Sequence, residues 1–265
     1  MKLYISVDIE GVAGISTWDE ATRWKPDYPP FREELMKELT AACSGANLSG
    51  AKEILVNDAH GVGRNIWFDG LPSNIKILRS VSGHPYNMMQ GLDNTFDAAL
   101  MIGYHSYAGS DRNPLAHTID TDILYIKING QYASELLINT YTAAYEGVPV
   151  VFVSGDFGIC EEAKELNEYI SVVATTEGFG EAVLSEHPEV IAKNIEKEVQ
   201  KAIGKNYEIC KIVLPNTFKV EISYVNHAKA FKASFYPGVN RVSSSNVIYE
   251  SDNYFDVLRM LLFVL

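Results

Sequence analysis

The sequence has few cysteines, and they are far apart. Cys43, Cys160 and Cys210 are the three cysteines of the 265-residue chain, and none lies in a Cys-x-x-Cys or zinc-finger spacing. A disulfide framework and a thiolate metal site are therefore not expected. Isolated cysteines are typical of a reducing compartment, so we expect a cytoplasmic protein.

Long hydrophobic runs and clusters of positive charge are also missing. No apolar run approaches the roughly 20 residues of a membrane span, and the first residues lack the pattern of a signal peptide. The apolar run 257–265 fits a buried helix or an oligomer contact, and the formal net charge is −12. Because neutralising phosphates requires clustered Lys and Arg, neither nucleic acid nor a membrane is expected as a partner.

Strand and helix patterns alternate over residues 1–160. Apolar, β-branched runs predict buried strands at 3–7, 53–56, 75–79, 97–102, 123–128 and 149–153, and helical spacing predicts helices at 31–47 and 135–145. Strand, helix and strand in succession indicate a right-handed βαβ unit. We therefore expect an α/β fold whose mostly parallel core sheet is flanked by helices, with a site at the carboxyl ends of its strands.

The pattern changes after about residue 160. Charged helices are predicted at 161–168 and 188–203, a half-exposed strand at 219–224, a short strand at 246–249 and a last helix after it. Residues 161–265 are therefore expected to form a smaller α+β part that closes the site and aids oligomerisation.

Acidic and imidazole side chains follow several of the predicted strands. Asp8 and Glu10 come directly after the first strand, and alternation along an extended chain places them on the same side. Two adjacent carboxylates repel each other, and a divalent metal is the usual way to offset that cost. Further candidates at strand ends or at a helix start are Asp58, His60, His105, Glu135 and Asp156.

The predicted sheet brings these candidates to one edge, because the carboxyl ends of parallel strands are where sites assemble. Carboxylate and imidazole ligands suit Zn²⁺, Mn²⁺ or Co²⁺. A carboxylate shared by two metals is the arrangement of two-metal hydrolases. Asp8 fits this bridging role because it follows the most buried strand.

Each candidate also has an ordinary structural explanation. Asp58 and His60 could form a hydrogen-bonded turn, and His105 could be a core histidine with satisfied hydrogen bonds. Glu135 could interact with the helix dipole, and Asp156 could cap the following helix. Taken together these structural explanations are less convincing, because they require that every candidate lies beside a strand or helix end by chance. The histidines without such a placement, predicted to be structural or on the surface, are His84, His187 and His227.

His117 lies in a loop punctuated by Gly109 and Pro114. A loop histidine near a metal centre is a candidate acid/base or transition-state group. An ordinary surface histidine is the alternative.

Several motifs together resemble those of the DppA-type D-aminopeptidase family. They are Ser6-Val-Asp-Ile-Glu-Gly-Val-Ala-Gly14, Val56-Asn-Asp-Ala-His-Gly61, Met88-Met-Gln-Gly-Leu-Asp93, Ile102-Gly-Tyr-His105, Leu115-Ala-His-Thr118 and Val150-Val-Phe-Val-Ser-Gly-Asp156. Their order and spacing resemble the family over about residues 1–160, and the C-terminal third does so more loosely.

The resemblance implies a zinc-dependent aminopeptidase, a hydrolase with two Zn²⁺ per subunit. Asp8 would bridge the metals, Glu10 and His60 would complete one site, and His105 and Glu135 the other. Members of the family assemble as ring-shaped decamers whose sites face an inner cavity. The resemblance therefore implies a homodecamer that acts on short peptides with an N-terminal D-amino acid, such as D-Ala-D-Ala.

By the same resemblance, His117 would be the catalytic histidine. Two other functions remain open at this point. Carboxylate and histidine clusters also serve metal-dependent phosphoesterases, although the sequence has no glycine-rich phosphate loop and few Arg near the motifs. A non-catalytic metal-binding assembly protein is the other alternative, and the intact set of six site residues argues against it.

Overall fold

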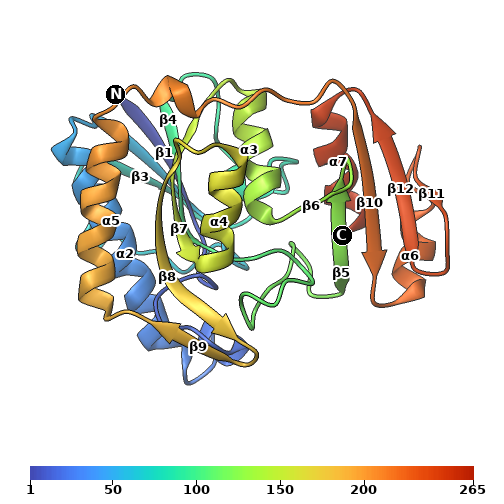
Figure 1. Ribbon diagram of the computed structural model, residues 1–265, viewed down its shortest axis with the longest axis horizontal. Helices are drawn as coiled ribbons and strands as arrows, with labels where there is room; N and C mark the ends of the chain where they lie inside the picture. The colour runs from blue at the N-terminus through green and yellow to red at the C-terminus, as the bar shows by residue number, and fades with distance from the viewer.

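A seven-stranded sheet forms the larger part of the molecule in the computed structural model, which describes residues 1–265 (Figure 1). The strand order is β3-β2-β1-β4-β7-β8-β9, and every neighbouring pair is parallel except β8 with β9. Every residue of β4 and β7 is buried, as expected for central strands covered on both faces. The strands are β1 (Lys2–Val7), β2 (Glu53–Asp58), β3 (Ile75–Leu78), β4 (Ala98–Tyr104), β7 (Val150–Asp156), β8 (Ser171–Phe179) and β9 (Ala182–Ser185).

Helices cover both faces of this sheet. Figure 1 shows α2 (Tyr28–Leu48) and α5 (Pro188–Ile203) on one side, and α3 (Glu135–Tyr145) and α4 (Phe157–Leu166) on the other. On α5 the buried residues Ile191, Ile195 and Val199 recur every four positions and so form one apolar stripe. This helix packs closely on α2 at Gly45, where a Cβ atom would lie 2.3 Å from the carbonyl oxygen of Glu196.

A second, antiparallel sheet lies beside the first (Figure 1). Its order is β11-β12-β10-β5-β6. Helices α6 (His227–Ala233) and α7 (Tyr254–Val264) pack against it. Its strands are β5 (Ile123–Ile128), β6 (Gln131–Tyr132), β10 (Phe218–Tyr224), β11 (Asn240–Arg241) and β12 (Asn246–Ser251). The remaining short helices are α1 (Trp18–Ala21), η1 (Asn87–Met89) and η2 (Tyr207–Cys210). No helix is both long and apolar enough to cross a membrane.

The predicted fold class is confirmed: a mostly parallel sheet flanked by helices, with a smaller part made of an antiparallel sheet and helices. The boundary between the two sheets does not follow the expected division at residue 160. Strands β5 and β6 come before it and belong to the second sheet, whereas β8, β9 and α5 come after it and belong with the first. The alternating burial of β5 suits an antiparallel strand with one exposed face. Strand β8 was not predicted, because its polar residues differ from the apolar run expected of a strand in a parallel sheet.

Candidate metal centre

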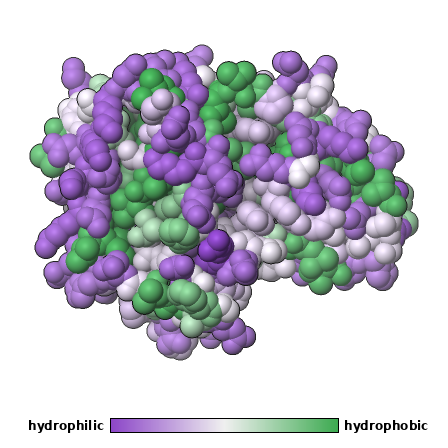
Figure 2. Space-filling view, viewed as in Figure 1, coloured by the Kyte–Doolittle hydropathy of each residue, from purple (hydrophilic) through white to green (hydrophobic).

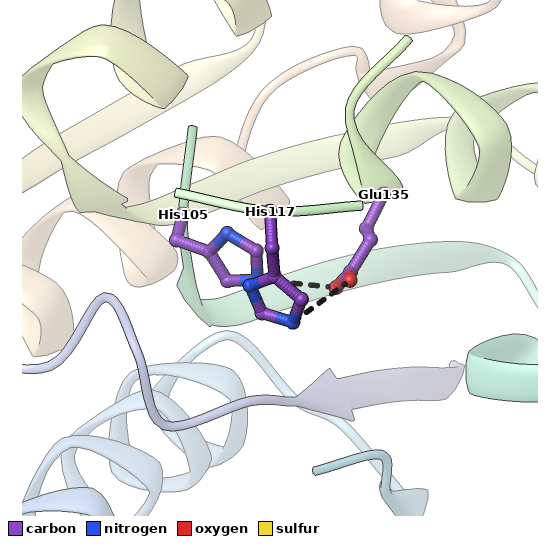
Figure 3. Close-up of side chains that lie close together, drawn as sticks. All are labelled: His105, His117 and Glu135. Carbon is purple, nitrogen blue, oxygen red and sulfur yellow. Dashed lines mark ion pairs between the residues drawn. The ribbon is translucent and has the colours of Figure 1, made fainter. Parts of the chain in front are cut away.

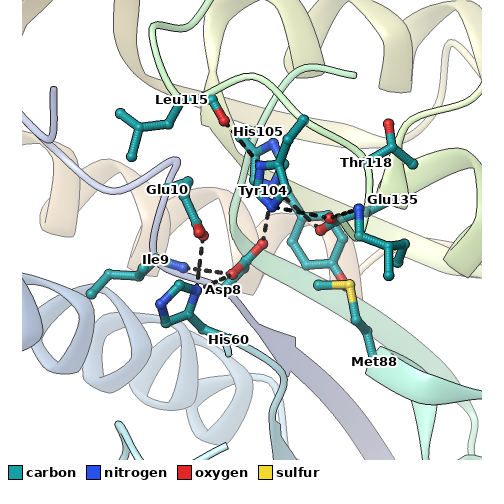
Figure 4. Close-up of polar contacts among 12 residues, drawn as sticks. Asp8, Ile9, Glu10, His60, Met88, Tyr104, His105, Leu115, Thr118 and Glu135 are labelled. Carbon is teal, nitrogen blue, oxygen red and sulfur yellow. Dashed lines mark hydrogen bonds and ion pairs between the residues drawn. The ribbon is translucent and has the colours of Figure 1, made fainter. Parts of the chain in front are cut away.

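Three neighbouring strands of the main sheet end close together, with β4 running two residues beyond the ends of β1 and β2. The register pairs Val7 of β1 with Asp58 of β2 on one side and with Ile102 of β4 on the other. The residues that follow these strand ends therefore meet at one edge of the sheet. They include Asp8, Glu10, His60 and His105, and the first turn of α3 adds Glu135 to the same place (Figure 4).

One half of the cluster contains Asp8, Glu10 and His60. Nδ1 of His60 lies 3.2 Å from Oδ1 of Asp8 and 3.0 Å from Oε2 of Glu10. Nε2 of the same ring lies 2.8 Å from the carbonyl oxygen of Ala21, which can only accept a hydrogen bond. The ring proton is therefore held at Nε2, and in the neutral ring the Nδ1 lone pair points at the two carboxylates.

The other half contains Asp8, His105 and Glu135. Nε2 of His105 lies 3.4 Å from Oδ2 of Asp8 and 3.3 Å from Oε2 of Glu135. Nδ1 of this ring donates to the carbonyl oxygen of Ser106 at 3.0 Å. The second imidazole thus repeats the arrangement of the first, in which a backbone carbonyl fixes one nitrogen and carboxylates face the other.

Asp8 joins the two halves. Its Oδ1 faces His60 and its Oδ2 faces His105 (Figure 4). The side chain is buried, and the backbone N–H of Ile9 donates to Oδ1 at 2.9 Å. Asp8 is the one carboxylate of the cluster that faces the histidines of both halves, whereas the two oxygens of Glu135 face His105 and His117.

The cluster fits divalent metals. Oε2 of Glu10 and Nε2 of His105 are buried and have no hydrogen-bond partner. One ligand atom from each of Asp8, Glu10 and His105 lies within 4.8 Å of the others, and the same holds for His105, His117 and Glu135. Buried nitrogen and carboxylate lone pairs that converge need either a proton or a metal cation between them, and nitrogen with carboxylate oxygen is the donor set of Zn²⁺ and similar metals. Fixing the second histidine nitrogen by a carbonyl is the usual support of a metal-binding imidazole.

The pKa values show how strongly these groups interact. Burial by itself would raise the pKa of Asp8, but the hydrogen bonds and positive charges of His105 and His60 hold it well below its usual range. Burial by itself would lower the pKa values of His60 and His105, but the neighbouring carboxylates raise both well above the usual value. In the absence of a metal, protons on the imidazoles thus offset the negative charge of the carboxylates. Metal binding would displace those protons.

His117 lies against the second half of the cluster (Figure 3). Its ring is stacked on that of His105, with centroids 4.2 Å apart and planes inclined by 8°. Nδ1 donates to the carbonyl oxygen of Leu115 at 2.9 Å, and Nε2 lies 3.6 Å from Oε1 of Glu135. Trp18 packs edge to face with the same ring, with centroids 5.1 Å apart and planes inclined by 72°. The loop histidine is therefore fixed in orientation beside the cluster.

A cavity of about 490 Å³ opens over these residues. Asp8, Glu10, His60, His117 and Glu135 line it. Four other lining residues had no predicted role at the site, and these are Asn87, Met88, Ile119 and Asp120. Met88 begins the motif 88–93, and the other three lie within two residues of that motif or of the motif 115–118.

Asp58 and Asp156 have structural roles, as their ordinary explanations predict. Asp58 accepts hydrogen bonds from the backbone N–H groups of Asn65 and Ile66. Asp156 caps α4 by accepting from the N–H of Ile159, and it also accepts from the N–H and hydroxyl of Ser106. Since Ser106 follows His105, Asp156 supports the cluster without belonging to it.

The remaining histidines lie outside the cluster. His187 caps α5 by accepting from the N–H of Glu189. His84 packs edge-on against Tyr86 and Phe255. His227 is exposed at the start of α6. These positions agree with their prediction as structural or surface residues.

A buried carboxyl on α2 anchors the loop that follows Glu10. Oε1 of Glu38 accepts from the N–H of Ala13 at 2.8 Å, and the side chain is fully buried. Burial raises the pKa of Glu38 to about 8, although the hydrogen bond from Ala13 opposes the shift; nearby Glu34 raises the pKa and Lys37 lowers it. The Glu38 carboxyl is therefore mostly protonated at neutral pH in the folded protein.

The substitution Glu38→Gln tests this protonation. Between about pH 4.5 and 8 the folded state holds a proton at Glu38 that the unfolded state has lost, so this group makes the protein less stable as pH rises. Glutamine cannot ionise, so we expect the variant to gain up to a few kcal/mol relative to the wild type between pH 5 and 9. Urea unfolding of both proteins across this range measures the difference, and a difference that does not change with pH would contradict the assignment.

The fold and the cluster together define a metal-dependent hydrolase on an α/β scaffold. A family model described as D-aminopeptidase (Peptidase_M55) matches residues 1–263, so the chain belongs to the D-aminopeptidase family and is a metallo-aminopeptidase.

Individual relatives agree with this assignment. The chain is 28% identical over 264 residues to a D-aminopeptidase of Bacillus subtilis (strain 168), covering 99% of this chain and 96% of the relative. Its fold matches a solved structure described as the Zn-dependent D-aminopeptidase DppA from Bacillus subtilis, a self-compartmentalizing protease. That match has a TM-score of 0.93 at 27% identity and covers 100% of this chain and 96% of the other.

Proposed function

We propose that this metallo-aminopeptidase is a dinuclear zinc enzyme that hydrolyses short peptides with an N-terminal D-amino acid, such as D-Ala-D-Ala. The observation that carries the dinuclear assignment is the position of Asp8, whose two oxygens face separate sets of imidazole and carboxylate. The zinc-dependent solved relative and the family description support the metal and the substrate class. Mn²⁺ and Co²⁺ suit the same donor set.

Each proposed metal has three ligands from the chain. Glu10, His60 and Asp8 would hold one, and His105, Glu135 and Asp8 would hold the other. When bound, the metals supply Lewis-acid polarisation of the peptide carbonyl and a water of lowered pKa.

His117 is the proposed catalytic acid/base. Because Nδ1 is held by the carbonyl oxygen of Leu115, Nε2 is the nitrogen that exchanges protons in the cavity. Nε2 takes a proton from the attacking water and returns it to the leaving amine nitrogen. The carboxylate of Glu135, 3.6 Å from Nε2, stabilises the imidazolium that exists between these two transfers.

The lining of the cavity offers no basic side chain that would hold a phosphate ester. It includes four carboxylates, from Asp8, Glu10, Asp120 and Glu135, and no Lys or Arg. The charges of Asp8, Glu10 and Glu135 would be offset by the proposed metals, and Asp120 is paired with Lys229 at 2.6 Å. The phosphoesterase alternative therefore has no support from the side chains that line the site.

The substrate proposal predicts a stereochemical preference that depends on metal. Protein loaded with Zn²⁺ is expected to hydrolyse D-Ala-D-Ala faster than L-Ala-L-Ala, and chelation is expected to abolish both reactions until Zn²⁺ is restored. Release of free alanine measures each rate. Cleavage of the L-peptide alone would contradict the proposed preference for D-peptides but would remain consistent with the proposed dinuclear site. Cleavage of neither peptide would contradict the proposed substrate class.

The assembly proposed here is a ring-shaped homodecamer in the cytoplasm, with the sites facing an inner cavity that admits short peptides. The description of the solved relative as self-compartmentalizing supports an oligomer. Hydrophobic side chains gather over β8 and β9 on the face drawn in Figure 2, where Phe179 and Leu184 are 58% and 63% exposed, and patches of this kind often mark subunit contacts. The three free, buried cysteines suit a reducing compartment. Light scattering on the purified protein measures the subunit number.

A further inference from the structure

The segment from Tyr86 to Gln90 forms a wall of the metal cavity. It includes η1 and overlaps the Met-Met-Gln-Gly-Leu-Asp motif, which supplies none of the cluster residues. Asn87 and Met88 nevertheless line the same cavity as Asp8 and Glu135. The motif therefore has a position at the site but no assigned role in it.

Buried hydrogen bonds fix the backbone of this wall. The carbonyl oxygen of Met88 accepts from the hydroxyl of Ser6 at 2.9 Å and from the side-chain amide of Asn57 at 2.6 Å. The carbonyl oxygen of Gln90 accepts from the hydroxyl of Tyr4 at 2.9 Å, and its side-chain amide donates to Oδ1 of Asn57 at 3.0 Å. Breaking any of these would leave a buried polar group unsatisfied, so the wall cannot move without a large cost.

The partners of the wall lie on the elements that carry the proposed metal ligands. Ser6 precedes Asp8 by two residues on β1 and points to the same side of the chain. The hydroxyl of Tyr104, the residue before His105, donates to Oγ of Ser6 at 2.7 Å. Asn139, one turn after Glu135 on α3, donates to that Tyr104 hydroxyl at 2.9 Å. Wall and cluster thus share one rigid network, and the position of the wall is set relative to the metals.

Met88 is the one buried side chain among the apolar residues that line the cavity. Its exposure is 5%, whereas the lining residues Trp18 and Val81 are 39% and 56% exposed and therefore lie near the opening. Its sulfur lies 3.5 Å from Nδ2 of Asn139. Figure 4 shows the thioether beside Tyr104 and extending toward the cluster. With its backbone fixed, the length of the Met88 side chain decides how much room remains there.

We propose that Met88 is a specificity-determining residue that limits the N-terminal residue of the substrate to a small side chain. This inference rests on the aminopeptidase function proposed above. An aminopeptidase accommodates one residue before the scissile bond, so its site must be closed on that side. The locked wall provides that closed end, and Met88 occupies the space that a larger side chain would need.

The substitution Met88→Ala tests this directly. The ratio of kcat/KM for D-Leu-D-Ala to that for D-Ala-D-Ala is expected to rise about tenfold or more, since a few methylene groups in an apolar pocket are worth that much discrimination. Met89→Ala is the matched control, because Met89 is fully buried in the same segment but does not line the cavity. This control removes the same side-chain volume and should leave the ratio unchanged.

Two further measurements guard against loss of the fold and against failure of the proposed reaction. Met88→Leu conserves volume and should fold normally, yet leucine reaches less far than methionine, so a smaller rise of the same sign is expected. Calorimetric binding of D-leucine amide and D-alanine amide needs no turnover, and Met88→Ala should improve the relative affinity for D-leucine amide. Lack of any peptide cleavage by the wild type would count against the proposed function alone, because the binding measurement still tests Met88.

Three results would overturn the role of Met88. The first is an unchanged kcat/KM ratio in both Met88 variants when the melting temperature and metal content are preserved. The second is an equal change of this ratio in Met89→Ala. The third is a rise in kcat/KM for D-Ala-D-Leu, relative to D-Ala-D-Ala, in place of a rise for D-Leu-D-Ala. The last result would assign Met88 to the second residue of the substrate.

Discussion

Replacing Asp8 by alanine is expected to remove both metals together. Each proposed metal uses one oxygen of Asp8, so the variant loses a ligand from both sites at once. Without the metals, water is not acidified and the carbonyl is not polarised, so kcat/KM should fall by about a thousandfold or more. Elemental analysis of the purified variant gives the metal content, and peptide hydrolysis gives the rate.

Comparison with other variants makes the bridging role of Asp8 testable. Glu10→Ala removes a ligand from one proposed site only, so it should leave up to one metal per subunit where Asp8→Ala leaves none. Glu38→Gln changes a buried carboxyl outside the cluster and should retain both metals. One tightly held metal per subunit in Asp8→Ala would show that this residue does not serve both sites.

His117→Ala is expected to separate catalysis from metal binding. The proposed ligand set is complete without His117, so the variant should keep its metals. Loss of a positioned acid/base group should lower kcat by about 10² to 10⁴-fold. Steady-state hydrolysis of D-Ala-D-Ala together with metal analysis measures both effects.

His84→Ala provides the control for a general effect of losing a histidine. His84 contacts Tyr86 and Phe255 and does not line the cavity, so near-normal turnover is expected. A His117→Ala variant with normal kcat would remove His117 from the mechanism. A variant that loses a metal would make His117 a ligand, in keeping with its place beside His105 and Glu135.

The cluster could be anticipated because its residues follow simple positional rules. Asp8, Glu10, His60 and His105 come just after buried strands, and parallel strands bring such positions together whatever the rest of the chain does. The same rule also selected Asp58 and Asp156. Their hydrogen bonds to Asn65 and Ser106 depend on how two loops return to the sheet, and no local pattern encodes that.

The cavity wall and the sheet boundary could not be anticipated for a related reason. Ser6 and Met88 are 82 residues apart in the sequence, and only the folded chain brings them into contact. Strand β5 has the apolar residues of a core strand, but its partner β10 lies almost a hundred residues later. Long-range pairing therefore decides which sheet a strand joins, while the local sequence decides only that it is a strand.

The way the chain passes between the two sheets has a consequence for biosynthesis. All six proposed site residues are translated by residue 135, yet β4 gains its neighbour β7 only near residue 150, and β5 gains β10 only near residue 220. A nascent chain that ends just after its last ligand therefore has unpaired edges on β4 and β5, and Glu135 lies on the helix that follows β5 and β6. Zinc loading is therefore expected to be completed late, close to release from the ribosome, and the polypeptide needs protection from aggregation until then.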